Sequence, residues 1–182
     1  LDAAVLRRAP PPIAEYEKLD EIPFDFARRR LSVVVWHGDE NLLVTKGEVE
    51  SVLSVCRSVR IDGAAQPLDA ARRALAAATF ERLSADGYRT LGVATRSVER
   101  SAAYTTAAES EMTLVGFAAF LDPPKPGVGA VLAALAGNGV AVVIMTGDNE
   151  FVTRKVARDV GLAADRIVTG GELDTMDDAA LA

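Results

Sequence analysis

The sequence predicts an α/β protein in two parts, an antiparallel sheet flanked by helices and then a shorter parallel segment. Up to residue 113, β-branched runs and amphipathic helix patterns follow one another without a strand–helix repeat, which favours an antiparallel sheet with helices packed on it. From residue 114 the order becomes strand, helix, strand, helix, strand. That order is typical of a parallel, doubly wound sheet.

The first part is expected to begin with a β-hairpin and a helix. Residues 31–36 and 42–45 are apolar and largely β-branched, and they flank a five-residue turn in which His37 is a solvated loop residue. An apolar stripe at i, i+3, i+4 and i+7 predicts a helix over residues 47–57. Cys56 falls on its apolar face, so we expect it to be a small core residue.

A longer helix is predicted over residues 69–86. Asp69 suits the N-cap and Gly87 suits the position after the last helical turn. A strand over residues 91–95 follows, and residues 97–112 are polar and Ala-rich, which predicts a loop or a frayed helix.

The second part is predicted from apolar runs that alternate with helix patterns. Its strands and helices are expected, in order, over residues 114–121, 127–137, 140–145, 149–160 and 166–169. We place the domain boundary so that one domain covers residues 1–115 and the other covers residues 116–182.

Composition excludes several classes of protein. A net charge of −6 argues against a nucleic-acid binder, although the run Arg28-Arg29-Arg30 could attract an anionic ligand. The single cysteine excludes an internal disulfide and a multi-cysteine metal site. No apolar stretch reaches the roughly 18–20 residues that span a bilayer. There is no signal peptide and no starting Met, so we expect a soluble piece of a longer protein.

Polar residues that can handle phosphate follow two predicted strands. Asp122 comes directly after one strand, and Thr146, Gly147 and Asp148 come directly after the next. The carboxyl ends of parallel strands share one edge of a sheet. There a carboxylate can hold Mg²⁺ and a hydroxyl can bind a phosphoryl oxygen.

The usual phosphate-binding loops are absent. Gly127-Val128-Gly129 opens a helix, but Leu132 occupies the third glycine position of a dinucleotide fingerprint, and no Walker loop occurs. Lys46-Gly47 lies where a strand passes into a helix, so the ammonium could reach a phosphate; an exposed turn is the alternative. Phe24 and Phe26 precede the basic run and could stack on a purine; core packing is the alternative for one or both.

Several segments, in this order, resemble the P-type ATPases, the phosphoenzyme-forming cation pumps. The segments are Glu21-Ile22-Pro23-Phe24-Asp25-Phe26 followed by Leu31-Ser32-Val33-Val34-Val35, then Val44-Thr45-Lys46-Gly47, Arg89-Thr90-Leu91-Gly92-Val93-Ala94, Leu121-Asp122-Pro123-Pro124-Lys125 and Met145-Thr146-Gly147-Asp148-Asn149. The resemblance covers nearly the whole chain. The run from Phe24 to Arg30 and the compact length are most similar to the bacterial magnesium-transporting branch.

The resemblance implies a nucleotide-binding domain followed by part of a Rossmann-like, haloacid-dehalogenase-like phosphorylation domain. Phe24 matches the aromatic residue that stacks on adenine. Lys46 and Gly47 match the Lys-Gly-Ala motif of the ATP pocket, and Arg89 matches an arginine that contacts the phosphates. Asp2 matches an acidic residue that faces the adenine amino group.

The downstream motifs are assigned in the same way. Asp122 and Lys125 match the hinge that returns to the phosphorylation domain. Thr146, Gly147 and Asp148 match the segment that holds ATP and the phosphoryl group, with Thr146 and Asp148 in the phosphoryl-transfer site of the intact pump.

Some family features are missing or altered. Glu48 stands where the family usually has Ala, which adds a negative charge near the phosphates. The Asp-Lys-Thr-Gly-Thr segment with the phosphorylated Asp, the Thr-Gly-Glu loop and the membrane helices are not in this sequence. The resemblance therefore implies a chain that binds ATP with Mg²⁺ but does not turn it over alone.

In the intact protein this chain would be the cytoplasmic domain of a bacterial inner-membrane pump. Its partners would be the remaining phosphorylation, actuator and membrane domains. Two alternatives stay open, a phosphatase fragment of the haloacid dehalogenase type and a non-catalytic regulatory module.

Overall fold

The structure is a computed structural model that describes residues 13–164 and 167–177. Packing divides the described chain into two compact units. The first contains the residues up to Phe80 together with Thr90–Phe120, and the second contains Glu81–Arg89 together with the residues from Leu121 onward.

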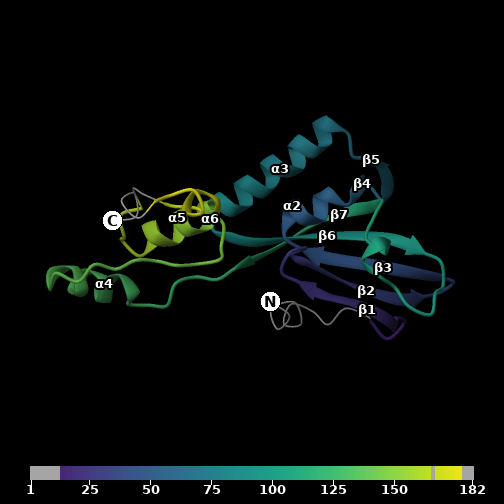
Figure 1. Cartoon of the computed structure of the whole chain (residues 1–182), viewed down its shortest axis with the longest axis horizontal. Helices are drawn as coiled ribbons and strands as arrows, with labels where there is room; N and C mark the ends of the chain where they lie inside the picture. Colours follow the sequence, from purple (N-terminus) through teal and green to yellow (C-terminus); the bar gives the residue numbers. More distant parts are fainter. Residues whose placement is uncertain (1–12, 165–166, 178–182) are drawn as a thin grey trace. The chain divides into compact units, whose positions relative to one another are not determined.

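The first unit is built on a seven-stranded sheet with the order β1-β2-β3-β6-β7-β4-β5 (Figure 1). Its strands are β1 (Glu17–Asp25), β2 (Arg30–His37), β3 (Glu40–Gly47), β4 (Cys56–Ile61), β5 (Ala64–Pro67), β6 (Tyr88–Val98) and β7 (Met112–Leu121). The pairs β1/β2, β2/β3, β3/β6 and β4/β5 are antiparallel, whereas β4 and β7 are parallel. The mixed α/β class is confirmed, and so is an antiparallel sheet flanked by helices.

The hairpin of β2 and β3 is tighter than predicted. His37 pairs with Glu40, so the turn contains only Gly38 and Asp39 rather than five residues. Gly38 has φ +61°, a value that glycine adopts without the steric cost that a Cβ brings. His37 is therefore the last residue of a strand, where its ring stacks on Tyr16 with the ring centroids 4.2 Å apart.

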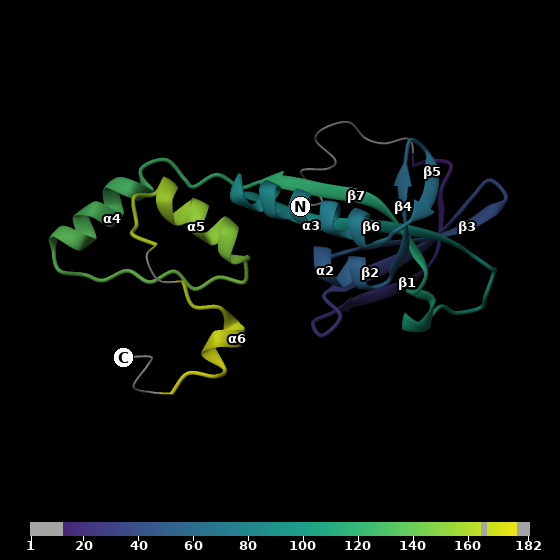
Figure 2. The ribbon, with the colours of Figure 1, turned by 90° about the horizontal axis from the view of Figure 1, so that it is seen from above.

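Helices cover one face of this sheet. Figures 1 and 2 show α2 (Val49–Ser54) and α3 (Ala70–Ala85) on the same side of it. A short 3-10 helix, η1 (Thr106–Ala108), lies in the segment predicted as a loop or frayed helix. The core beneath the helices is formed by buried apolar side chains from strands and helices, among them Val34, Leu43, Val49, Val52, Leu53, Ala94, Met112 and Leu114.

Cys56 is buried as predicted, but it lies in a strand rather than a helix. The helix ends at Ser54, and Cys56 opens β4, which continues through a turn at Asp62 and Gly63 into β5. The dipeptide Asp62-Gly63 is typical of a tight turn, whereas the two short strands around it lack a regular apolar alternation. Burial raises the pKa of the Cys56 thiol to about 11.

The described residues of the second unit do not form the parallel strands that the sequence predicted. It contains α4 (Val128–Gly137), α5 (Glu150–Asp159) and α6 (Gly170–Leu173). The first two lie close to the helices predicted over residues 127–137 and 149–160, whereas α6 was not predicted. Residues 140–145 form no strand, and Val143 and Met145 are 81% and 93% exposed. Residues 167–169 also form no strand, and the predicted first strand belongs to the sheet of the first unit, as β7.

The prediction of a parallel β-α-β segment is therefore wrong for this structure. An extended segment becomes a strand only when a neighbour accepts and donates its backbone hydrogen bonds. The described residues of the second unit supply no such neighbour, so the apolar run of residues 140–145 remains irregular.

We predict a large difference in amide hydrogen exchange between these regions. Amides paired in β2, β3 and β6 should exchange slowly because their hydrogen bonds lie within a continuous sheet, whereas those of residues 140–145 should exchange fast. Exchange followed by mass spectrometry measures this directly. Equal protection of both regions would show that residues 140–145 are paired in solution.

Candidate functional site

Two exposed aromatic rings stand at one end of the sheet. Phe24 lies in β1, and Phe26 lies in the turn that leads to β2. Their ring centroids are 5.3 Å apart and the ring planes make an angle of 88°, an edge-to-face pair. Phe24 is 50% exposed and Phe26 is 88% exposed, so neither is a core residue. Apolar surface of this kind is typical of a ligand-binding or interaction site.

The turn that carries Phe26 is held by its own backbone and by Asp25. The Asp25 carboxylate accepts a hydrogen bond from the Arg28 N–H at 2.8 Å, and the Asp25 carbonyl accepts one from the Arg29 N–H at 2.7 Å. Arg29 has φ +51°. An Asp at the first position of such a turn satisfies backbone donors that would otherwise lack partners.

The basic run after Phe26 is paired with carboxylates. Arg28 and Arg30 both contact Glu109, and their side chains are only 20% and 13% exposed. Arg29 contacts Glu48, with 2.9 Å between its Nη1 and Oε1, and both side chains are more exposed. Arg28 and Arg30 are thus already paired within the chain, and they do not serve the anionic ligand that the sequence suggested for this run. The charge of Glu48 is balanced by Arg29.

Glu109 is the buried carboxylate at the centre of this arrangement. Its Oε2 lies 2.6 Å from Arg28 Nη1 and 2.9 Å from Arg30 Nε, and its Oε1 accepts a hydrogen bond from Ser32 Oγ at 2.7 Å. Since Ser32 donates its only proton to Glu109, the 2.7 Å contact between Ser32 Oγ and Thr45 Oγ1 must have Thr45 as the donor.

Electrostatics keep Glu109 ionised. Burial by itself would raise the pKa of this carboxyl, but the hydrogen bonds from Ser32, Arg28 and Arg30 and the charge of Arg28 outweigh it and hold the pKa below its ordinary value. Sequence reasoning missed Glu109 because it lies in a segment predicted as a loop. No local pattern separates a buried carboxylate from an exposed one.

Lys46 and Gly47 occupy the end of β3 near the aromatic pair. Gly47 pairs with Arg30 on one side and Gly92 on the other, and Arg30 pairs with Asp25, the neighbour of Phe24. Thr45 and Gly47 are buried on the helix-covered side, so the half-buried Lys46 projects to the opposite face. The register therefore brings Phe24 and Lys46 to the same end of the sheet.

Gly47 is required by close packing within the chain. A Cβ built at this position would lie 2.5 Å from the carbonyl oxygen of Arg29 and 2.5 Å from the Cβ of Arg30. Sequence reasoning assigned this glycine to the approach of a ligand. The structure shows that the turn after Phe26 occupies that space.

The remaining predicted site residues lie in the second unit. Arg89 Nε is 2.9 Å from Asp148 Oδ1, and Thr146 Oγ1 accepts a hydrogen bond from the Asp148 N–H at 3.1 Å. Asn149 caps α5 by accepting from the Val152 N–H at 3.0 Å. The structure thus brings Arg89 of β6 to Asp148, which lies with Thr146 and Gly147 in the segment that leads into α5.

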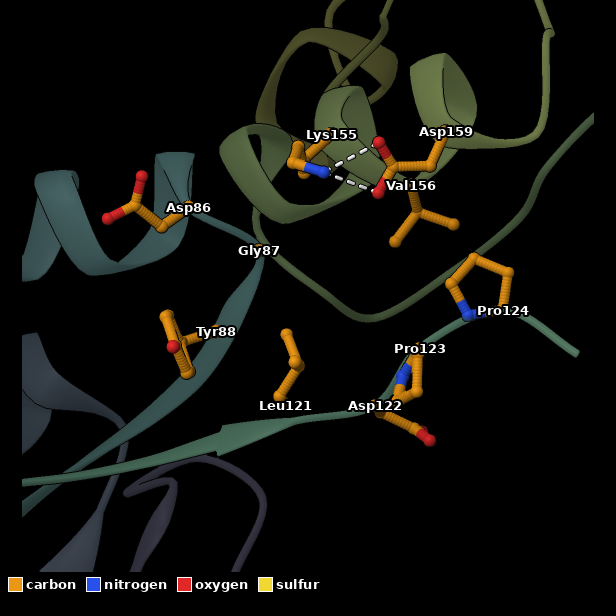
Figure 3. Close-up of a pocket in the computed structure, with 10 residues that line it drawn as sticks. All are labelled: Asp86, Gly87, Tyr88, Leu121, Asp122, Pro123, Pro124, Lys155, Val156 and Asp159. Atoms are coloured by element: carbon orange, nitrogen blue, oxygen red, sulfur yellow. Dashed lines mark hydrogen bonds and ion pairs between the residues drawn. The ribbon is translucent and has the colours of Figure 1, made fainter.

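The predicted hinge residues follow β7. Asp122 lines a cavity of about 320 Å³ in the second unit, between the end of β7, the start of β6 and α5 (Figure 3). On the α5 side, Lys155 Nζ is 2.6 Å from Asp159 Oδ1. Lys125 lies in the irregular segment before α4. A hinge at Asp122 and Lys125 stays a prediction.

One predicted site residue cannot be located in the structure. Asp2 lies outside the described residues. Within residues 13–164 and 167–177, no group of three or more His, Cys, Asp or Glu side chains could hold a metal ion, and no helix is both long and apolar enough to cross a membrane.

Comparison with known families identifies the class of this protein. A family model described as "P-type ATPase, cytoplasmic domain N" matches residues 11–127. This match covers more than half of the chain, and the chain belongs to the P-type ATPase cytoplasmic domain N family.

Individual relatives are similar over almost the whole chain. The magnesium-transporting ATPase, P-type 1, of Escherichia coli (strain K12) is 42% identical over 171 residues, which cover 93% of this chain and 19% of that protein. The protein of the same name from Salmonella typhimurium (strain LT2) is 42% identical over 193 residues, which cover 100% of this chain and 21% of that protein. A calcium-transporting ATPase of Bacillus subtilis (strain 168) is 28% identical over 151 residues, which cover 82% of this chain and 17% of that protein. The chain thus spans about a fifth of the length of these relatives.

We predict that Gly47→Ala destabilises the first unit by about 1–3 kcal/mol. The new methyl group would meet backbone atoms that cannot move without opening the turn. Urea unfolding measures the change, and Gly137→Ala, where a Cβ meets nothing within 4 Å, is the control. Equal stability of Gly47→Ala and wild type would mean that the turn relaxes freely.

Glu109 should make the free energy of unfolding of the first unit depend on pH. Its folded pKa lies below the ordinary value of 4.5, so its contribution is complete above that value and is lost as the pH falls through the folded pKa. Glu109→Gln should lower the free energy of unfolding by about 3–5 kcal/mol at pH 6, because two arginines lose their buried partner.

The measurement is the free energy of unfolding in urea between pH 6 and pH 3. Glu109→Gln should show a weaker pH dependence than wild type, whereas Glu111→Gln, which changes an exposed carboxylate paired with Arg57, should follow wild type. Identical acid dependence in wild type and Glu109→Gln would contradict the assignment.

Proposed function

We propose that this chain binds ATP as the nucleotide-binding domain of a bacterial P-type cation pump. The observation that carries the proposal is the exposed Phe24 ring, in β1 beside an ordered turn and at the same end of the sheet as Lys46, in a chain of the domain N family. Phe24 stacks on the adenine, and the Lys46 ammonium neutralises phosphate charge, with Gly47 beside it. Asp2 faces the adenine amino group.

The side chains present fit a nucleotide. An adenine needs an apolar face of about its own size, which a half-exposed phenyl ring supplies, and such stacking is worth roughly 1–3 kcal/mol. The phosphates need cations, and Lys46 and Arg89 are candidates for that role. Mg²⁺ enters with the nucleotide in this proposal, since phosphates rather than a protein cage usually hold it.

In the intact pump the domain presents the γ-phosphate to an aspartate outside this chain. Thr146, Gly147 and Asp148 belong to the phosphoryl-transfer site, and Asp122 and Lys125 form the hinge. Catalysis of this type consists of positioning and electrostatic stabilisation, so the chain alone binds ATP without turnover. Residues 1–115 act as the nucleotide-binding domain, and residues 116–182 are part of the phosphorylation domain.

The transported ion is proposed from the relatives. Two of them, 42% identical to this chain, are named magnesium-transporting ATPases, whereas a relative named for calcium is 28% identical. We therefore propose Mg²⁺ transport by the full-length protein, in the bacterial inner membrane, with this domain on the cytoplasmic side. Its partners are the remaining phosphorylation, actuator and membrane domains. Membership of the domain N family supports this proposal over a haloacid-dehalogenase phosphatase fragment or a regulatory module.

The test is a calorimetric titration of the chain with ATP. Phe24→Ala should weaken ATP binding by about fivefold to 150-fold, because it removes the ring that stacks on the base. Lys46→Met should weaken ATP more than adenosine, since only ATP carries the phosphate charge that the ammonium neutralises.

Tyr16→Ala is the matched control, because Tyr16 is a partly exposed aromatic residue at the other end of the sheet. It should bind ATP as wild type does. Unchanged affinity in Phe24→Ala would refute the stacking role. Hydrolysis of a generic phosphomonoester by wild type would instead favour a phosphatase.

A further inference from the structure

The proposed adenine site stands on a turn that the rest of the chain holds in place. Phe24 is half exposed and Phe26 is mostly exposed, so core packing does not fix the edge-to-face geometry of their rings. The turn between β1 and β2 lies at an end of the sheet, and its own hydrogen bonds come from Asp25. Contacts with the start of α2 also hold it: the Glu48 N–H donates to the Arg29 carbonyl at 3.0 Å, and Ser51 Oγ donates to the Arg28 carbonyl.

The Arg28 side chain adds a connection between the backbone before Phe24 and a buried carboxylate. Its Nη2 donates a hydrogen bond of 2.8 Å to the carbonyl of Pro23, the residue before Phe24. Its Nη1 donates to both carboxylate oxygens of Glu109, at 2.8 and 2.6 Å. A planar guanidinium can make these contacts together because its donors point in fixed directions.

Glu109 is the fixed point of this connection. It lies 81 residues further along the chain, its side chain has no exposed surface, and it also contacts Arg30 and the buried Ser32 of β2. Arg30 in turn donates to Ser51 Oγ of α2 at 2.9 Å. Through Arg28 and Arg30, one carboxylate thus connects the turn, the sheet and a helix. The stability of the core alone would not require the hydrogen bond from Arg28 to the Pro23 carbonyl.

We propose that Glu109 is a positioning residue for the adenine-binding aromatic pair, acting through Arg28. This inference rests on the proposed ATP site. The carboxylate holds the Arg28 guanidinium, the guanidinium holds the backbone at Pro23, and Phe24 and Phe26 keep their edge-to-face geometry before the nucleotide arrives. Preorganisation of this kind lowers the ordering cost of binding.

The first experiment needs no nucleotide. With ring-labelled phenylalanine, wild type should show a nuclear Overhauser effect between the Phe24 and Phe26 rings, which Arg28→Lys should weaken or lose. Lysine keeps the positive charge but lacks the second nitrogen that reaches Pro23. Glu109→Gln should behave in the same way. Arg28→Lys decides the question if Glu109→Gln does not fold.

The second experiment measures affinity for ATP and for inorganic tripolyphosphate. Arg28→Lys and Glu109→Gln should bind ATP roughly three- to tenfold more weakly, a fraction of the loss from removing Phe24, and should bind tripolyphosphate as wild type does. In a Phe24→Ala background the same changes should have no further effect on ATP binding, because the ring through which they act is absent. Glu111→Gln should match wild type in every assay.

The outcomes separate the two proposals. Folded variants that keep the ring contact and wild-type ATP affinity would overturn the positioning role and leave the ATP site intact. A loss that persists in the Phe24→Ala background, or that is equal for tripolyphosphate, would also overturn it, since Glu109 would then act on the whole unit. A wild-type chain that binds no ATP would overturn both.

Discussion

The first unit depends on one buried negative charge. An ionised carboxylate away from water is costly unless charges and hydrogen bonds compensate it. At Glu109 two guanidinium groups and one hydroxyl do so, and Ser32 is itself completed by Thr45. Among the described residues, no buried side-chain nitrogen or oxygen lacks a hydrogen-bond partner. Arg28 and Arg30 are therefore ordered by the interior rather than displayed for a ligand.

The two faces of the sheet carry different side chains. On the helix side, small or hydroxyl-bearing residues allow close approach: Gly47 faces the turn, and Gly92 faces Val52, to which a Cβ would come within 3.0 Å. On the other face the side chains remain half-buried, and Lys46 is among them. The alternation of a strand thus keeps the structural charge network and the proposed phosphate-binding lysine on opposite faces.

The second unit follows a different logic. Its helices form with local signals, such as the Asn149 cap of α5 and the capping box at Thr169 and Glu172. Its apolar run at residues 140–145 has the composition of a strand but no partner in the described chain. Local propensity is sufficient for a helix, whose hydrogen bonds are internal, and insufficient for a strand, whose hydrogen bonds require a neighbour.

The sequence by itself determined the class of protein, the hairpin, the helices and the segments on which family membership depends, because periodicity and short motifs are local. It also pointed to Phe24 and Lys46 as candidate site residues, with core packing of the Phe24 ring as the alternative interpretation. Tertiary structure decided which arginines are paired, why Gly47 is glycine, and that Glu109 is buried. Those facts depend on contacts between residues as many as 81 positions apart. No local pattern encodes such contacts, because they exist only once the turn, the sheet and the loop before β7 have come together.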